Sequence, residues 1–248
     1  MIKTKFLALA LLLIGTAVSP VSAKEYKTAL FGVKSDGTTN NTRSIQKAVD
    51  FISENGGGEL AFYVGRYLTG TIHLKSNVTI VIKEGAALMA STSPYDYDYV
   101  NGTAALIVAD TAKNIGITGK GLIDGQGTLV TGHYNTQAAQ GNLAAGKNTV
   151  PALMNGCTGV TVEGILLNNS AEDVAIFNNC TDVTVTGITV DSKLNPATAG
   201  VVLEGCTNVK LNESFIDVPA AALQTKGAAS KGVSVTNSIT PNGKKISP

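Results

Sequence analysis

The sequence contains no tryptophan, only two histidines and a low share of charged residues, 15 %. Its formal net charge is +1, so it lacks the excess of one sign that is typical of proteins that bind nucleic acid or membrane surfaces, and neither partner is predicted. After the first residues there is no long apolar run, which excludes a membrane-spanning protein. The 27 glycines and the few charges are typical instead of a solenoid with many turns.

The first 23 residues have the pattern of a secretory signal peptide. Lys3 and Lys5 form the charged start, residues 6–14 form a short apolar run, and Val21-Ser22-Ala23 is a small-x-small cleavage site. The residue directly after the cleavage site is Lys24 and not a cysteine, which argues against a lipid anchor. We therefore predict a secreted or periplasmic protein whose mature part, residues 24–248, is a single domain.

One short phrase, Cys-Thr-x-Val followed by alternating apolar residues, recurs in the second half of the chain. Its cysteines are Cys157, Cys180 and Cys206, spaced by 23 and 26 residues. A period in the low twenties, made of short β-branched strands without helices between them, indicates coils that bury their apolar faces against their neighbours. We predict an all-β fold, a right-handed parallel β-helix of about seven coils, with the coils in residues 59–240.

The three cysteines occupy the same position of the repeat and should form a column in the stack. An odd number of cysteines in an exported protein would ordinarily suggest one disulfide and one leftover thiol. Free cysteine is among the most buried residue types, so we favour a column of buried thiols. A disulfide between neighbouring coils stays open as the alternative, provided that the side chains turn toward each other.

A helix is predicted ahead of the coils, in an N-terminal cap that comprises residues 24–58. Ile45, Ala48, Val49 and Ile52 have the spacing of one face of an amphipathic helix, and the glycines that follow end it. Such a helix would cover the open strand edges of the first coil. No comparable element follows the last coil. We therefore expect an open C-terminal end, and three explanations stay open: a partner such as a second copy of the chain, a short distorted last coil, or a truncated gene.

Two polar segments interrupt the repeat. Residues 91–99 combine tyrosines with carboxylates, which suits either stacking on sugar rings or a loop pinned by its tyrosines, and we favour the loop. Residues 128–149 form a polar insertion of the kind that often walls a binding groove. His133 has no second ligand nearby in sequence, and no cluster of spaced acids suits calcium, so we predict no metal site and no cofactor.

Several stretches carry a resemblance that goes beyond the repeat: Phe31-Gly32 with Asp36-Gly37, Gly56-Gly57-Gly58, residues 67–79 and residues 119–127. The first three resemble the N-terminal signature of the pectate-lyase-like superfamily. Residues 119–127 resemble a coil of the polygalacturonase-type glycoside hydrolases, family 28. The likeness covers about residues 29–227. It implies the same β-helix and a pectin-type polysaccharide as the partner.

The resemblance also implies where catalytic aspartates should lie. Polygalacturonase-type enzymes carry one in an Asn-Thr-Asp-Gly motif and two in a Gly-Asp-Asp motif, and they hydrolyse with inversion. The matching positions are Ala199, Ala220 and Ala221. The His-Gly and Arg-Ile-Lys motifs expected after Gly227 are absent as well. Alanine transfers no protons, so we predict no catalytic residues and a pseudoenzyme that has lost hydrolysis.

Three polar residues near these positions are candidates for substrate binding: Glu204, Asp217 and Lys226. The leading hypothesis is an exported, family 28-like protein that binds polysaccharide without cleaving it. The alternative is an active glycoside hydrolase or lyase that uses other carboxylates, such as Glu204 and Asp217. A third hypothesis is a surface protein in which the β-helix is a rigid structural or adhesive element.

Overall fold

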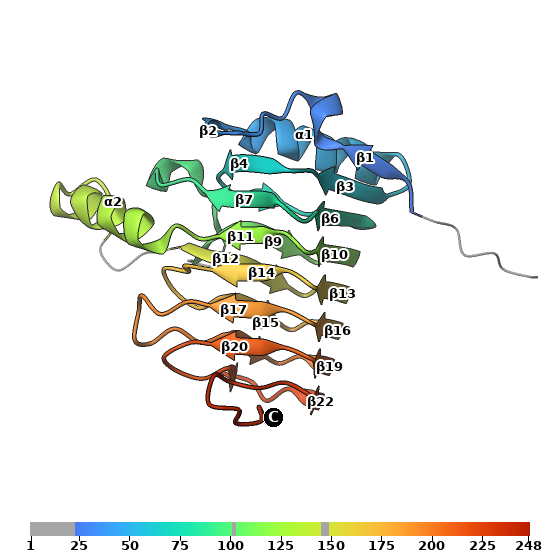
Figure 1. Cartoon of the computed structure of the whole chain (residues 1–248), viewed down its shortest axis with the longest axis vertical. Helices are drawn as coiled ribbons and strands as arrows, with labels where there is room; N and C mark the ends of the chain where they lie inside the picture. Colours follow the sequence, from blue (N-terminus) through green and yellow to red (C-terminus); the bar gives the residue numbers. More distant parts are fainter. Residues whose placement is uncertain (1–22, 101–102, 145–148) are drawn as a thin grey trace, which may run out of the picture.

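The computed structural model describes residues 23–100, 103–144 and 149–248. Residues 1–22 of the predicted signal peptide lie outside these ranges. The chain winds into a stack of coils whose strands form three parallel sheets (Figure 1). This confirms the predicted all-β, right-handed parallel β-helix. In the described ranges, no helix has both the length and the apolar content needed to cross a bilayer.

The strands of each sheet follow one another in the order of the chain. Sheet A contains β1 (Glu25–Lys27), β3 (Gly58–Phe62), β6 (Val78–Ile82), β10 (Lys113–Gly119), β13 (Thr158–Glu163), β16 (Thr181–Thr186), β19 (Thr207–Asn212) and β22 (Lys231–Thr236). Sheet B contains β2 (Asp36–Asn40), β4 (Gly65–Thr69), β7 (Ala86–Ala90), β11 (Leu122–Asp124), β14 (Leu166–Asn168), β17 (Thr189–Asp191) and β20 (Phe215–Asp217). Sheet C contains β5 (Ile72–His73), β9 (Thr103–Asp110), β12 (Thr149–Asn155), β15 (Ala175–Asn178), β18 (Val201–Glu204) and β21 (Leu223–Thr225), and β8 (Tyr99–Val100) pairs antiparallel with β9.

The coils stack in register, so equivalent residues of successive coils lie side by side. In sheet A, Val160, Val183 and Val209 are successive rungs, and all three are buried. Successive side chains of a strand point to opposite faces, so the apolar residues of the repeat fill the interior while the residues between them face outward. β-branched side chains suit this arrangement because they pack well on a pleated surface.

The three cysteines form a buried column between sheet C and sheet A. Cys157, Cys180 and Cys206 are free and buried, which confirms the predicted thiols. The Cys180 thiol donates to the carbonyl oxygen of Met154 at 3.3 Å, and the Cys206 thiol donates to that of Phe177 at 3.2 Å. Contact with the two neighbouring thiols, together with burial, raises the pKa of Cys180 and keeps it protonated.

The N-terminal end of the stack is covered by a helix, α1 (Thr42–Glu54) (Figure 1). The apolar residues predicted to face the coils, Ile45, Ala48, Val49 and Ile52, are all buried. The helix packs on β3, β5 and β6, and the short 3-10 helix η1 (Thr28–Phe31) packs against it. The predicted amphipathic helix is therefore present at the predicted place.

The C-terminal end of the stack is closed differently. After β22 the chain folds back, and the N–H of Ile246 donates to the carbonyl oxygen of Ser238 at 2.9 Å. Ile246 is buried in the core, while Val233 and Val235 of the last strand are only partly buried. We expected an open end, whereas a short turn covers part of it. Oligomerisation through this end stays a prediction.

The polar insertion begins with a helix that was not predicted. This helix, α2 (Gly127–Ala139), projects from the side of the stack (Figure 1). It lies against η2 (Pro94–Asp96) of the tyrosine-rich loop, where the hydroxyl of Tyr95 donates to Oε1 of Gln137 at 2.8 Å. The hydroxyl of Tyr99 donates to that of Tyr134 at 3.1 Å. The tyrosines thus join the loop to the insertion.

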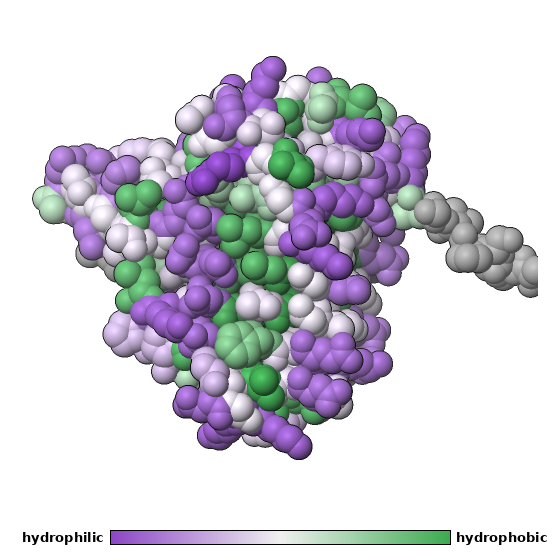
Figure 2. Space-filling model, viewed as in Figure 1, coloured by the Kyte–Doolittle hydropathy of each residue, from purple (hydrophilic) through white to green (hydrophobic). Residues whose placement is uncertain are grey.

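The outward face of sheet B carries a band of apolar residues. Leu122, Leu166 and Phe215 occupy aligned outward positions, with Thr189 between the last two. Leu166 is 38 % exposed. Figure 2 shows a green and white band along this face with purple, hydrophilic surface on both sides.

Candidate functional site

The positions matched to the family's aspartates lie on neighbouring coils, at the turns that lead into sheet C. Ala199 precedes β18, whereas Ala220 and Ala221 precede β21. The N–H of Ala220 donates to the carbonyl oxygen of Thr198 at 3.1 Å, and that of Gly200 donates to Ala221 at 2.9 Å. The two motifs are therefore stacked, as their spacing predicts. None of the three alanines offers a group that can transfer a proton.

Asp173, on the preceding coil, uses both of its carboxylate oxygens in this region. Oδ1 accepts a hydrogen bond from the N–H of Ala199 at 2.8 Å. Oδ2 lies 2.6 Å from Nζ of Lys226, which follows β21. The ion pair therefore spans the coil that contains β18. The Asp173 side chain is 14 % exposed and that of Lys226 is 46 % exposed.

A groove of about 440 Å³ lies beside this ion pair on the outward face of sheet C. Ile176 of β15 and Val202 of β18 are successive outward rungs and give the groove its apolar surface. The other lining residues are polar or charged: Thr103, Asn155, Asp173, Asn178, Asn179, Glu204 and Lys226.

A row of polar side chains runs along the groove, one from each coil. Asn155, Asn178 and Glu204 are aligned at the ends of β12, β15 and β18. Nδ2 of Asn178 donates to Oδ1 of Asn155 at 2.9 Å. Asn155 is only 7 % exposed, and its Nδ2 has no hydrogen-bond partner among the described residues. A buried unpaired donor costs about 1–3 kcal/mol, so an oxygen atom brought to this amide would be favoured.

The structure brings together two of the three predicted binding residues. Glu204 and Lys226 both line the groove. Asp217 lies in sheet B instead, where its carboxylate is paired with Lys193, and the same ammonium lies 3.3 Å from Asp191. Asp217 does not line the groove. Glu204 and Asp217 therefore do not form the alternative catalytic pair within it.

Two residues of the polar row, Asn155 and Asn178, were not predicted. The two asparagines could have been found from the repeat. They and Glu204 each stand two residues before a cysteine of the column, so the three side chains are expected to be aligned. Asp173 lies at a corner of its coil, where acids are usually solvated. Its partner Lys226 is 53 residues away in sequence, and only the stacking of the coils brings the two together.

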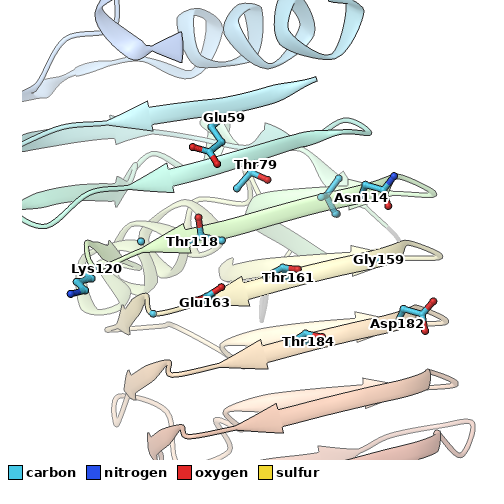
Figure 3. A pocket seen from close by; sticks show the side chains of 13 residues that line it. Glu59, Thr79, Asn114, Thr118, Lys120, Gly159, Thr161, Glu163, Asp182 and Thr184 are labelled. Atoms are coloured by element: carbon cyan, nitrogen blue, oxygen red, sulfur yellow. The ribbon is translucent and has the colours of Figure 1, made fainter. Parts of the chain in front are cut away.

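A larger hollow, of about 830 Å³, lies on the outward face of sheet A (Figure 3). Figure 3 shows Thr79 of β6, Thr161 of β13 and Thr184 of β16 on this face. Gly116 of β10 is aligned between Thr79 and Thr161, and a Cβ added to it would lie 2.9 Å from the Thr79 side chain. The hollow is lined by threonines, glycines and charged side chains, among them Glu59, Lys120, Glu163 and Asp182. None of the three positions matched to the family's aspartates lies in it. We therefore place the candidate site on sheet C.

The sheet C groove offers hydrogen bonds, charge and an apolar surface within one concave site, the combination that small-molecule sites use. Its amides can donate and accept, whereas its two carboxylates accept and its one ammonium donates. Within the part of the chain that the structure describes, no group of three His, Cys, Asp or Glu side chains is placed to hold a metal ion.

Comparison with known proteins connects this fold to a family. Residues 61–247 match the family described as "Glycosyl hydrolases family 28". A Vitis vinifera protein named "Probable polygalacturonase" is 28 % identical over 218 residues, which cover 80 % of this chain and 44 % of that protein. The chain spans less than half the length of the first curated relatives that it matches.

Two solved structures have the same fold. A crystal structure from Parabacteroides merdae, provisionally assigned as a glycosyl hydrolase, is 44 % identical with a TM-score of 0.84, covering 91 % of this chain and 99 % of that one. The family 28 exopolygalacturonase of Yersinia enterocolitica is 21 % identical with a TM-score of 0.77, covering 88 % of this chain and 49 % of that one. The second likeness concerns the fold alone.

Proposed function

Because the chain belongs to glycosyl hydrolase family 28, we propose that it binds a pectin-type polysaccharide in the sheet C groove without hydrolysing it. The ligand class follows from relatives that are named polygalacturonases. The loss of hydrolysis rests on one observation. Ala199, Ala220 and Ala221 stand at the positions that match the family's aspartates.

Inverting hydrolysis needs two carboxyl groups on opposite sides of the bond that breaks. One donates a proton to the leaving oxygen, and the other activates a water molecule. General acid–base catalysis contributes about 10²–10⁴-fold to the rate. Methyl side chains perform neither task, so a site with alanine at these positions can keep its binding surface while it loses the chemical step.

In this proposal the two acids that line the groove, Asp173 and Glu204, do not take over the roles of the missing pair. Both oxygens of Asp173 accept hydrogen bonds, one from the N–H of Ala199 and one from the ammonium of Lys226. This carboxylate is therefore engaged on both sides. Glu204 is then the one acid of the groove that forms no salt bridge with a described residue. A single carboxylate does not supply both steps.

Binding is supported by the groove's lining. A sugar ring presents hydroxyl and ether oxygens at its edge and C–H groups on its faces. The unpaired Nδ2 of Asn155 can donate to such an oxygen, and the amides of Asn178 and Asn179 add donors and acceptors. Ile176 can pack against the C–H groups, whereas Val202 is 2 % exposed and offers little surface. We assign Glu204 and Lys226 as further binding residues.

The protein is also proposed to be exported, to the periplasm or the outside of the cell. The support is the charged start, short apolar run and small-x-small site within residues 1–23. In this proposal the mature protein is one β-helix domain, residues 24–248, with the cap in 24–58 and the insertion in 128–149.

A second function, hydrolysis by Asp173 and Glu204, is favoured by one observation: both acids line the same groove. In this case the protein would release reducing sugar from pectin. Asp173→Asn and Glu204→Gln would each abolish the release, because each removes one of the two required groups.

The test measures cleavage and binding on the same preparation. Pectin is incubated with the mature protein, reducing ends are assayed against a buffer blank, and binding is followed by isothermal titration calorimetry. We expect saturable binding and no new reducing ends. Asn155→Ala should weaken binding about tenfold, whereas Asn242→Ala, an exposed amide in the C-terminal turn, should have no effect.

Three other results decide between the functions. Cleavage that Glu204→Gln abolishes establishes the second function and overturns the first. Neither cleavage nor binding overturns both. Binding that Asn155→Ala leaves unchanged, in a variant whose circular dichroism is native, removes the groove from the proposal.

A further inference from the structure

We propose that the groove selects uncharged stretches of a pectin-type chain, such as methyl-esterified galacturonate, over free galacturonate. This inference rests on the proposed binding function and adds the charge of the ligand to it. It depends on the position of the charged groups around the groove, which disfavours a ligand carboxylate.

Two acids and one base line the groove: Asp173, Glu204 and Lys226. Nζ of Lys226 lies 2.6 Å from Oδ2 of Asp173, so these two charges compensate each other. Glu204 has no salt-bridge partner within the described ranges. The groove therefore presents an excess of negative charge to whatever enters it.

A further acid lies near the groove. Asp110 at the end of β9 is aligned with Asn155 of the next coil. Charges in a partly dehydrated groove interact more strongly than in bulk water, so a carboxylate on each bound sugar would be repelled.

Lys226 offers a ligand carboxylate little compensation. To bind a uronate as an ion pair it would have to leave Asp173 or be shared with it. Asp173 is 14 % exposed, and loss of its partner would leave a mostly buried charge unpaired. A methyl ester avoids this penalty, because it has no charge and still provides a carbonyl oxygen for a donor such as Nδ2 of Asn155.

The experiment compares oligogalacturonides of equal length, one fully methyl-esterified and one fully de-esterified, by isothermal titration calorimetry. A chelator is included so that no divalent cation bridges the acids. At low ionic strength the ester should bind about tenfold more tightly. The difference should shrink as salt is added, because the screening length falls to about 10 Å at 0.1 M ionic strength.

Two matched variants identify the charge responsible. Glu204→Gln removes a charge with little change of shape, so it should raise the affinity for the de-esterified chain relative to that for the ester and narrow the difference between the two. Glu163→Gln makes the same chemical change on sheet A, away from the groove, and should alter neither affinity. If Glu204→Gln does not fold, the salt dependence of the unsubstituted protein still tests the inference.

Equal affinities, or tighter binding of the de-esterified chain, overturn this inference while the proposed function stands. A preference for the ester that does not respond to salt or to Glu204→Gln overturns the electrostatic explanation. A protein that binds neither chain overturns the proposed function and the inference together.

Discussion

The outward faces of sheet A and sheet C are built in the same way but carry different side chains. In both, the register of the stack aligns one residue per coil into a row. The sheet A row contains Thr79, Gly116, Thr161 and Thr184, all of which are short. The sheet C row, Asn155, Asn178 and Glu204, is joined by a hydrogen bond and adjoins an ion pair that spans a coil.

The difference shows that the size of a hollow does not identify a site. The sheet A hollow is the larger of the two. The sheet C groove is smaller, but it contains an ion pair and a buried amide nitrogen that has no hydrogen-bond partner among the described residues. Side chains that are joined by hydrogen bonds or ion pairs, or that lack a hydrogen-bond partner, affect the binding of a ligand. Empty volume alone does not.

The largest expected effect is on stability and comes from a glycine of sheet A. Gly119 has φ +120°, and an added Cβ would lie 2.1 Å from the carbonyl oxygen of Ile82 on the adjacent coil. Gly119→Ala should therefore lower the free energy of unfolding by at least about 2 kcal/mol, measured by urea denaturation.

Gly132→Ala is the matched control for this substitution. Gly132 lies in α2, is exposed and has no atom within 4 Å of an added Cβ. The change should stabilise the protein by about 0.5–1 kcal/mol, because alanine has the higher helix propensity. If the two substitutions changed the free energy of unfolding equally, the close contact between Gly119 and the backbone of Ile82 would not be important for stability.

An intermediate effect is expected from the ion pair of sheet C. Lys226→Met keeps most of the apolar stem but leaves Asp173 without its ammonium partner, whereas Asp173→Asn removes the carboxylate. A double-mutant cycle should give a coupling energy of about 0.5–1 kcal/mol, because Lys226 is almost half exposed. The coupling should decrease with salt. A coupling of zero would mean that the bridge does not organise the groove.

The smallest expected effect comes from a substitution in the row of threonines on sheet A. Thr184→Val replaces a hydroxyl in the hollow by a methyl group of similar shape, and valine suits a strand equally well. The free energy of unfolding should change by less than about 0.5 kcal/mol, and the affinity for pectin should not change. A loss of affinity would show that ligand reaches sheet A and would remove the contrast between the faces.

The parts of the fold that could be predicted are those that depend on local pattern. The recurring cysteine phrase predicted the register of the stack and the column of thiols, and the spacing of Ile45 and Ile52 predicted α1. In contrast, α2 was not predicted, because its sequence begins with glycine and threonine and has no clear apolar face. The burial of Ile246 was not predicted either, because it depends on how the chain folds back onto the last coil after β22.

The residues of the candidate site also divide into those that could be predicted from the sequence and those that could not. The aligned alanines and the candidates Glu204 and Lys226 could be selected from spacing, because residues one repeat apart become neighbours in the stack. The bridge from Lys226 to Asp173 and the unpaired amide of Asn155 could not. They depend on the direction of side chains and on which backbone groups remain free after the strands have paired.

The amino-acid sequence by itself determined the parallel β-helix, its buried thiols and the absence of acids at Ala199, Ala220 and Ala221. Periodic burial needs no knowledge of distant contacts, since each coil repeats the pattern of the one before it. Only the tertiary structure decided which polar groups meet on sheet C and that Asp217 is not among them. The turns between strands vary in length from coil to coil, and the direction of each corner side chain follows from the packing of neighbouring coils.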